Sequence, residues 1–285
     1  MAILRKVVIG FLLGLPLKGF TQGEQLRSEK WGKGAGMMNV ESVVFDTKNN
    51  NLYVSNGENY APGTKGFISK FNANGELDAL KWVDKLSRPT GMAIHNDQLW
   101  VVDVDQLKVI DLTIGKVVKS YPEPVEHSAL NDVAINPKGE VFVTASFEHA
   151  VFKLEGDTLK FWVQDKKRLK WANGIFATDH EVWVGGAWFS AINIDTKEIR
   201  EIKSNPPIQD IDGLWPDGKV GYILSTVDGS SLWHLDAQGK STLLEQGGDY
   251  FGDLQYVPEN TLLYVPRGDH KEKRYYLAVF KLEQP

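Results

Sequence analysis

A short segment recurs six times along the chain, and this repeat limits the available folds more than any other feature of the sequence. Each copy begins with a polar or small residue and continues into a mainly apolar strand. A turn rich in Asn, Asp, Pro, Lys and Gly follows, and then a second apolar strand. The copies begin at Glu41, Thr90, Asn131, Asn173, Asp212 and Gly252, which lie 39 to 49 residues apart. Such turn residues supply the positive φ angles and side-chain-to-backbone bonds that hairpins need.

A third strand follows the second in every copy, and a fourth follows in most copies, as at Thr158–Trp162. Four short strands in each repeat of about 40 residues are typical of a β-propeller with one meander per blade. The sequence therefore predicts an all-β fold, a six-bladed β-propeller of four-stranded antiparallel blades over residues 41–285. A β-sandwich, the competing all-β fold, does not predict one strand–turn–strand order repeated six times.

The residues before the repeats divide into two segments. Arg5 and Lys6 precede an apolar run over residues 7–17, which is too short to span a bilayer and has the layout of a secretory signal peptide. We expect residues 1–23 to be this signal and the protein to be exported, periplasmic or secreted. A buried N-terminal strand is the alternative. Residues 24–40 are predicted to be an N-terminal linker or the strand that closes the ring. No later segment is long and apolar enough to be transmembrane.

Composition excludes several classes of function. The 285 residues carry a formal net charge of −5, so the chain lacks the basic footprint of a nucleic-acid-binding protein. It has no cysteine, which excludes disulfides, thiolate metal ligands and a cysteine nucleophile. It also has no G-x-S-x-G motif, which argues against a serine hydrolase.

The first residues of the six repeats are expected to meet at one mouth of the central channel, because the innermost strand of every propeller blade runs along it. None of these residues is apolar, and Glu41, Asn131, Asn173 and Asp212 offer oxygen ligands. Carboxylates and amides without Cys or His favour a hard divalent cation such as Ca²⁺, Mg²⁺ or Mn²⁺. The alternative is that these residues cap the strands and bind the backbone or water.

Four motifs in this order resemble the regucalcin (senescence marker protein) and gluconolactonase family. They are Glu41-Ser42, Leu130-Asn131-Asp132 followed by Asn136-Pro137-Lys138-Gly139, Ala172-Asn173-Gly174, and Ile211-Asp212-Gly213. The resemblance implies one divalent metal cation held by Glu41, Asn173 and Asp212, with Ca²⁺ as the expected ion and Mg²⁺, Mn²⁺ or Zn²⁺ as alternatives. It also implies that Asn131 contacts water or substrate. Members of the family hydrolyse sugar lactones, and relatives act on phosphotriesters or other lactones.

The activity implied by the resemblance is metal-dependent hydrolysis of a lactone or related ester, with a small molecule as the partner. The cation acts as a Lewis acid on the carbonyl, and Asp212 serves as metal ligand and general base. Lys170, at the end of a basic run, and Trp171 are expected to bind substrate. The other interpretation of that run is a solvated loop.

The sequence also departs from the family pattern. Many gluconolactonase-like members carry an Arg shortly before the third-blade Asn, whereas this chain has none at residues 127–130. The strand after Glu41 reads Val43-Val44-Phe45 in place of Pro-Val-Trp. These departures slightly favour the alternative function, a non-catalytic propeller of the NHL type that binds a small ligand or a protein partner, whereas the intact set of Glu41, Asn173 and Asp212 favours the enzyme.

Overall fold

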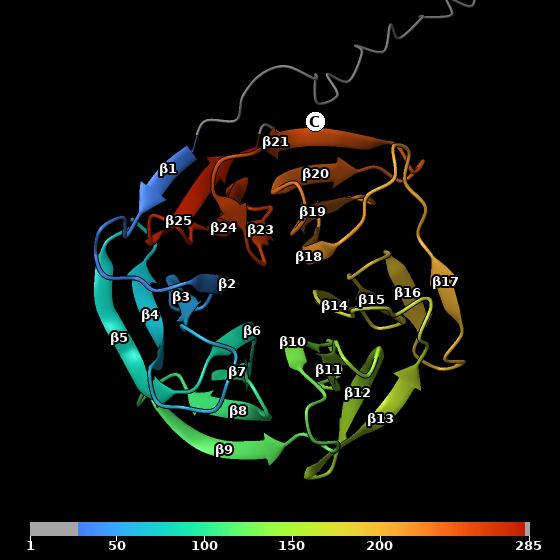
Figure 1. The fold of residues 1–285 in the computed structure, drawn as a ribbon, viewed down its shortest axis with the longest axis horizontal. Helices are drawn as coiled ribbons and strands as arrows, with labels where there is room; N and C mark the ends of the chain where they lie inside the picture. The colour runs from blue at the N-terminus through green and yellow to red at the C-terminus, as the bar shows by residue number, and fades with distance from the viewer. Residues whose placement is uncertain (1–27, 283–285) are drawn as a thin grey trace, which may run out of the picture.

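The computed structural model describes residues 28–282, and this part of the chain contains β-strands and no helix. The strands form six antiparallel sheets around a central channel, which confirms the predicted six-bladed β-propeller (Figure 1). The first blade consists of β2 (Val40–Asp46), β3 (Asn51–Asn56), β4 (Gly66–Asn72) and β5 (Leu77–Leu86). The second consists of β6 (Pro89–His95), β7 (Gln98–Asp103), β8 (Gln106–Asp111) and β9 (Lys116–Pro122). The third consists of β10 (Leu130–Ile135), β11 (Val141–Ala145), β12 (Ala150–Glu155) and β13 (Thr158–Gln164). The next two are formed by β14 (Ile175–Ala177), β15 (Glu181–Val184), β16 (Ser190–Asn193) and β17 (Ile199–Glu201), and by β18 (Ile211–Pro216), β19 (Tyr222–Thr226), β20 (Ser231–Leu235) and β21 (Ser241–Gln246).

The sixth blade combines the two ends of the described chain. It consists of β22 (Tyr250–Phe251), β23 (Gln255–Val257), β24 (Leu262–Asp269), β25 (Arg274–Lys281) and β1 (Ser28–Trp31). Strand β1 pairs antiparallel with β25, so the N-terminal segment supplies the outermost strand of the last blade. Trp31 in β1 lies against Tyr264 of β24, with ring centroids 5.9 Å apart. The ring is therefore closed by backbone pairing and by an aromatic contact.

The hydrophobic core is divided into six layers, one between each pair of neighbouring blades. The layer between the third and fourth blades is typical: Phe142 and Val151 pack with Val182 and Ile192. Because each blade is covered on both faces, central strands such as β11 are buried along their whole length.

Two predictions concern membranes and export. The predicted signal peptide, residues 1–23, lies outside the described residues. Within residues 28–282, no helix has the length and hydropathy that crossing a bilayer requires.

Candidate functional site

The candidate site is built where the inner strands begin. Strands β2, β6, β10 and β18 each start with a break in their pairing to the second strand of the blade. These breaks fall at Glu41, Thr90, Asn131 and Asp212, the first residues of four repeats. Irregularities of this type bend a strand and redirect its side chains.

Glycines let neighbouring inner strands approach closely at the same level of the channel. A Cβ atom at Gly174 would lie 2.1 Å from the carbonyl oxygen of Asp212, and one at Gly252 would lie 2.3 Å from that of Glu41. In three blades a second-strand hydroxyl accepts the backbone N–H freed by the irregularity, over 2.9 Å, at Ser55, Thr144 and Ser225. The polar starts of the repeats are thus held by a tightly packed backbone.

Two of the three predicted metal ligands are in direct contact. The Asn173 amide donates a hydrogen bond from Nδ2 to Asp212 Oδ1 over 2.8 Å. Among residues 28–282 no donor reaches Asn173 Oδ1 or Asp212 Oδ2. Glu41 is an electrostatic neighbour of Asp212, and its Oε2 atom is buried without a hydrogen-bond partner in the described chain.

Asn131 lies beside this group through a short chain of hydrogen bonds. Its Nδ2 donates to Ser146 Oγ over 3.2 Å, and the Ser146 hydroxyl donates to the carbonyl of Ala172 over 2.7 Å. Ala172 directly precedes Asn173. The other amide atom, Asn131 Oδ1, is buried and has no partner among the described residues.

Thr90 and Gly252 complete the ring of repeat starts without adding a ligand. The Thr90 hydroxyl donates to the carbonyl of Asn131 over 2.6 Å, so it joins the second blade to the third. Gly252 has no side chain. The polar ring predicted from the sequence therefore contains both structural members and members with free oxygen atoms.

Burial and mutual repulsion disfavour the ionised form of the mouth carboxylates. Burial raises the pKa of Asp212 to about 6, although the Asn173 hydrogen bond and the positive charge of Arg88 act in the opposite direction. Burial is also the largest cause of the raised pKa of Glu41, followed by the negative charge of Asp212, with Arg88 again opposing. The site therefore gains free energy from a positive charge placed between these groups.

Arg88 is a site residue that the sequence analysis missed. It lies two residues before Thr90, and its charge acts on Glu41, on Asp212 and on the hydroxyls of Tyr60 and Tyr250. Its guanidinium donates to the carbonyl of Pro89 over 3.1 Å and forms no ion pair with another described residue. The sequence signal was available, since Arg-Pro-Thr stands at the start of the second repeat, one blade before the place where an arginine was sought.

The donor set fits a hard divalent cation. Within residues 28–282, no group of three or more His, Cys, Asp or Glu side chains is placed to hold a metal, so a metal here needs amide oxygens as ligands. Glu41, Asn173 and Asp212 provide two carboxylates and one amide. The buried, unpartnered Oε2 of Glu41 is the kind of atom that a cation satisfies.

Trp171 and Lys170 differ in how they relate to the site. Trp171 is 48% exposed, and its ring lies 5.9 Å from that of Phe147 and 5.3 Å from that of His149. Its backbone N–H donates to His149 Nδ1 over 3.1 Å, which fixes the turn before Asn173. Lys170 is exposed in the same turn, and its ammonium contacts none of the other predicted site residues.

Asp132 and Asp253 connect neighbouring blades. Asp132 Oδ2 accepts the Ile175 N–H over 3.1 Å, which links the third blade to the fourth. Asp253 Oδ2 accepts the Ser42 hydroxyl over 3.0 Å, which links the sixth blade to the first. Burial raises the pKa of Asp253 to about 8, and the negative charge of Asp212 adds to the effect.

Comparisons with known proteins identify the fold. No model of a protein family matches the chain, and no curated protein sequence matches it. Among solved structures, a gluconolactonase from Xanthomonas campestris matches with a TM-score of 0.66 at 13% identity, covering 86% of each chain. A luciferin-regenerating enzyme matches at 0.62 and 13%, covering 86% of this chain and 92% of its own. A virginiamycin B lyase from Staphylococcus aureus matches at 0.62 and 10%, covering 91% and 100%. These neighbours are enzymes, and at such identities the likeness establishes the shared propeller fold.

Proposed function

We propose that the chain is a metal-dependent hydrolase of a lactone or related ester, with its active site at the channel mouth. The observation that carries the proposal is the group of oxygen atoms from Glu41, Asn131, Asn173 and Asp212, two of which are buried without a donor in the described chain. The gluconolactonase among the structural neighbours supports the choice of reaction.

Glu41, Asn173 and Asp212 would hold the cation. A divalent cation supplies Lewis-acid polarisation of a carbonyl when it is bound. The hydrogen bond from Asn173 fixes the Asp212 carboxylate and leaves its Oδ2 available. In the metal-free protein the pKa of Asp212 is raised to about 6, so its carboxylate is ionised at neutral pH, as a metal ligand and general base must be.

Hydrolysis adds water across the C–O ester bond, and it yields a carboxylic acid and an alcohol. Asp212 takes the proton of the attacking water and returns it to the leaving alkoxide. Arg88 provides a positive charge at the same mouth, where it favours the carboxylate that the reaction produces. Asn131 orients the substrate or water, and exposed Trp171 and Phe147 offer a flat apolar surface beside Asn173.

The same exposed aromatic pair supports the second candidate function, a propeller that binds a ligand without turnover. Phe147 is 61% exposed and packs against the exposed ring of Trp171, so the two form a small apolar patch that a ligand or partner can cover. Under that function the cation stabilises the fold and no substrate is converted.

Two measurements separate these functions. The full-length protein is treated with EDTA and then titrated with Ca²⁺, Mg²⁺, Mn²⁺ or Zn²⁺ while its melting temperature is followed. A panel of sugar, alkyl and aryl lactones is then assayed for acid release by wild type and by the Asp212→Asn variant. We expect cation-specific stabilisation, and turnover in wild type that drops at least about 100-fold in the variant. Equal rates for the two proteins on every substrate would exclude the hydrolase.

Arg88 is tested by its effect on product release. Arg88→Ala should raise the inhibition constant of a hydroxy-acid product by about 10-fold, because a charged hydrogen-bonding partner is lost. Arg88→Lys should restore part of that affinity. An unchanged inhibition constant in both variants would remove Arg88 from the site.

A further inference from the structure

A cavity in the central channel begins beside the proposed metal site, where the Asp253 N–H donates to the Glu41 carbonyl over 2.8 Å, and extends toward the other end of the inner strands. It has a volume of about 570 Å³ and is lined by the inner strands of all six blades together with the turns that follow β2 and β6. None of the mouth residues Glu41, Asn173 and Asp212 lines it. Its volume lies within the range of about 300–1,000 Å³ that ligand pockets occupy.

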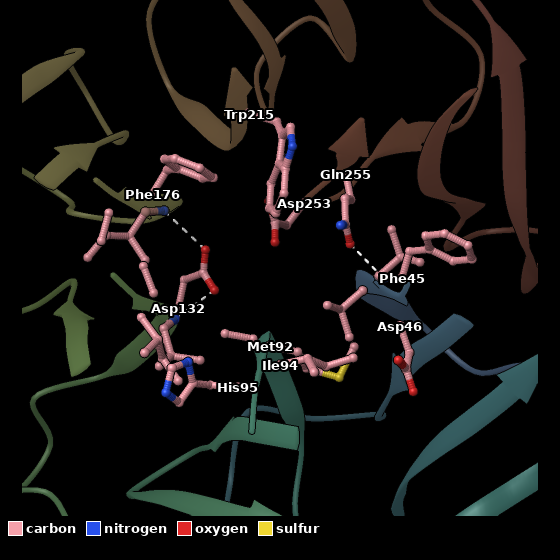
Figure 2. A pocket seen from close by; sticks show the side chains of 18 of the residues that line it. Phe45, Asp46, Met92, Ile94, His95, Asp132, Phe176, Trp215, Asp253 and Gln255 are labelled. Atoms are coloured by element: carbon pink, nitrogen blue, oxygen red, sulfur yellow. Dashed lines mark hydrogen bonds between the residues drawn. The ribbon is translucent and has the colours of Figure 1, made fainter. Parts of the chain in front are cut away.

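The amide nitrogen of Gln255, in the wall of this cavity, has no hydrogen-bond partner within the described residues. Gln255 is 7% exposed, and its Oε1 accepts the backbone N–H of Phe45 over 2.6 Å. That bond fixes the orientation of the amide, while Nε2 donates to no residue within 28–282. Figure 2 shows this nitrogen directed toward the middle of the cavity. The side chain as a whole is buried while this nitrogen opens onto the cavity, so a bound molecule can offer it an acceptor.

Two carboxyl groups face the same space. Figure 2 shows Asp132 of the third blade and Asp253 of the sixth blade with their carboxyl groups directed toward the middle of the cavity. The oxygens of Asp132 accept backbone N–H groups of Val133 and Ile175, so its position is rigid. Neither carboxyl forms an ion pair with another described residue. Each oxygen keeps capacity for a further hydrogen bond from a ligand.

Burial raises the pKa of Asp253 to about 8, and the rim offers no free cation among the described residues, so a bound ammonium group would favour the ionised form of these carboxyl groups. Lys48, the lysine in the lining, has its ammonium 2.6 Å from Asp97, also at the rim. The remaining lining carries acidic groups, the polar side chains of Thr47, His95, Asn96 and Gln255, and apolar walls. Trp215 and Phe176 meet edge to face there with ring centroids 5.0 Å apart, and Figure 2 shows Met92 and Ile94 across the cavity from them.

We propose that this cavity is a second ligand site, which binds a small primary amine with an apolar ring and a carbonyl next to the amine, the chemistry of an amino-acid amide. The ammonium group donates to Asp132 and Asp253, and the carbonyl accepts from Gln255 Nε2. The ring packs against Trp215 and Phe176. The site borders the hydrolase mouth and shares none of the three proposed metal ligands in its lining, and its occupation does not depend on turnover at the mouth.

The probe is phenylalaninamide, titrated into the full-length protein and followed by NMR line shapes of the ligand. A molecule of this size is expected to bind with a dissociation constant on the order of 1 mM or below. Two matched probes each lack one feature. N-acetylphenylalaninamide has no ammonium group and should bind at least about 10-fold more weakly. Phenethylamine has no carbonyl and should bind about 5-fold more weakly.

Two substitutions assign the contacts to the cavity. Gln255→Glu keeps the acceptor for the Phe45 N–H and removes the free donor, so the preference for phenylalaninamide over phenethylamine should disappear. Asp253→Asn keeps the shape of the side chain, and the Ser42 hydroxyl can accept a hydrogen bond from the new amide instead of donating one. The variant should bind phenylalaninamide and phenethylamine about 10-fold more weakly. Gln238→Glu and Asp157→Asn, on the exposed outside of the propeller, are the controls.

The binding results either support or overturn the proposed amine site. Loss of the amide preference in Gln255→Glu, with wild-type preference in the controls, supports the site even if Asp253→Asn fails to fold. Absence of saturable binding, equal binding of the acetylated probe, or an unchanged preference in Gln255→Glu overturns it. Cation-induced stabilisation measured in Gln255→Glu should equal that of wild type, which distinguishes failure here from failure of the proposed metal site.

Discussion

Replacing Asp212 by Asn should stabilise the metal-free protein. The carboxyl of Asp212 is desolvated and lies near Glu41, and its pKa is raised from 3.8 to about 6. A raised acid pKa means that the folded state binds protons more tightly than the unfolded state, so the free energy of unfolding falls as pH rises from about 4 to 6. The rise of this pKa from 3.8 to about 6 corresponds to ~3 kcal/mol of stability that is lost above pH 6.

Asparagine at this position removes that penalty and keeps the local structure, since its Oδ1 can still accept the Asn173 amide. In EDTA at pH 8 we expect a gain of ~3 kcal/mol, or about 5 °C or more in melting temperature for a chain of this size. At pH 4.5 the gain should shrink to about 1 kcal/mol, because less of the carboxyl is ionised in the folded state. With a saturating cation the order should reverse, since the variant loses a ligand.

The assay is calorimetric or fluorescence-detected melting of wild type and variant at both pH values, with and without the cation. Asp157→Asn is the matched control, because its side chain is 80% exposed and its charge carries little energy. A variant less stable than wild type in EDTA at pH 8, or a gain that does not vary with pH, would refute the reasoning.

Three further predictions concern the cation site, the packing of the channel and the closing strand. Glu41→Gln should reduce the stabilisation that a cation gives to the EDTA-treated protein, measured as the slope of melting temperature against cation concentration; an unchanged slope contradicts its role as a ligand. Gly174→Ala should destabilise by about 1–3 kcal/mol, because the new Cβ would lie 2.1 Å from the Asp212 carbonyl oxygen, whereas Gly63→Ala, whose nearest neighbour is 3.9 Å away, should change little. Both are measured by urea unfolding, and similar effects would remove the packing argument. Trp31→Ala should lower the free energy of unfolding by about 2 kcal/mol and increase proteolysis of the N-terminal segment, because it removes the aromatic contact that holds β1. Unchanged stability and proteolysis would show that backbone pairing with β25 is enough to hold β1 in place.

The six-bladed ring could be predicted because the sequence features that determine it are local. Apolar residues at period two, turn residues and a repeat of about 40 residues are all properties of neighbouring positions. The repeat starts at Glu41, Asn131 and Asp212 lie within or at the first residues of inner strands. Asn173 lies two residues before the shorter strand β14, which begins at Ile175.

The chemistry of the mouth was predictable in part. Residue type and repeat phase were enough to select Glu41, Asn173 and Asp212, because repeat symmetry brings equivalent positions to one ring. Their roles as metal ligands stay predictions. Lys170 belongs to the same sequence segment as Asn173, yet its exposed ammonium makes no contact with the other site residues within the described chain.

What the amino-acid sequence determined by itself is therefore the all-β class, the six blades and the polar character of the repeat starts, since each follows from local pattern and period. Only the tertiary structure decided that Arg88 shares the mouth with Glu41, that Asp132 serves as a link between blades, and that Gln255 presents an unused donor to a second cavity. These facts depend on contacts between blades far apart in sequence, where burial and hydrogen bonding across the ring give each polar group its environment.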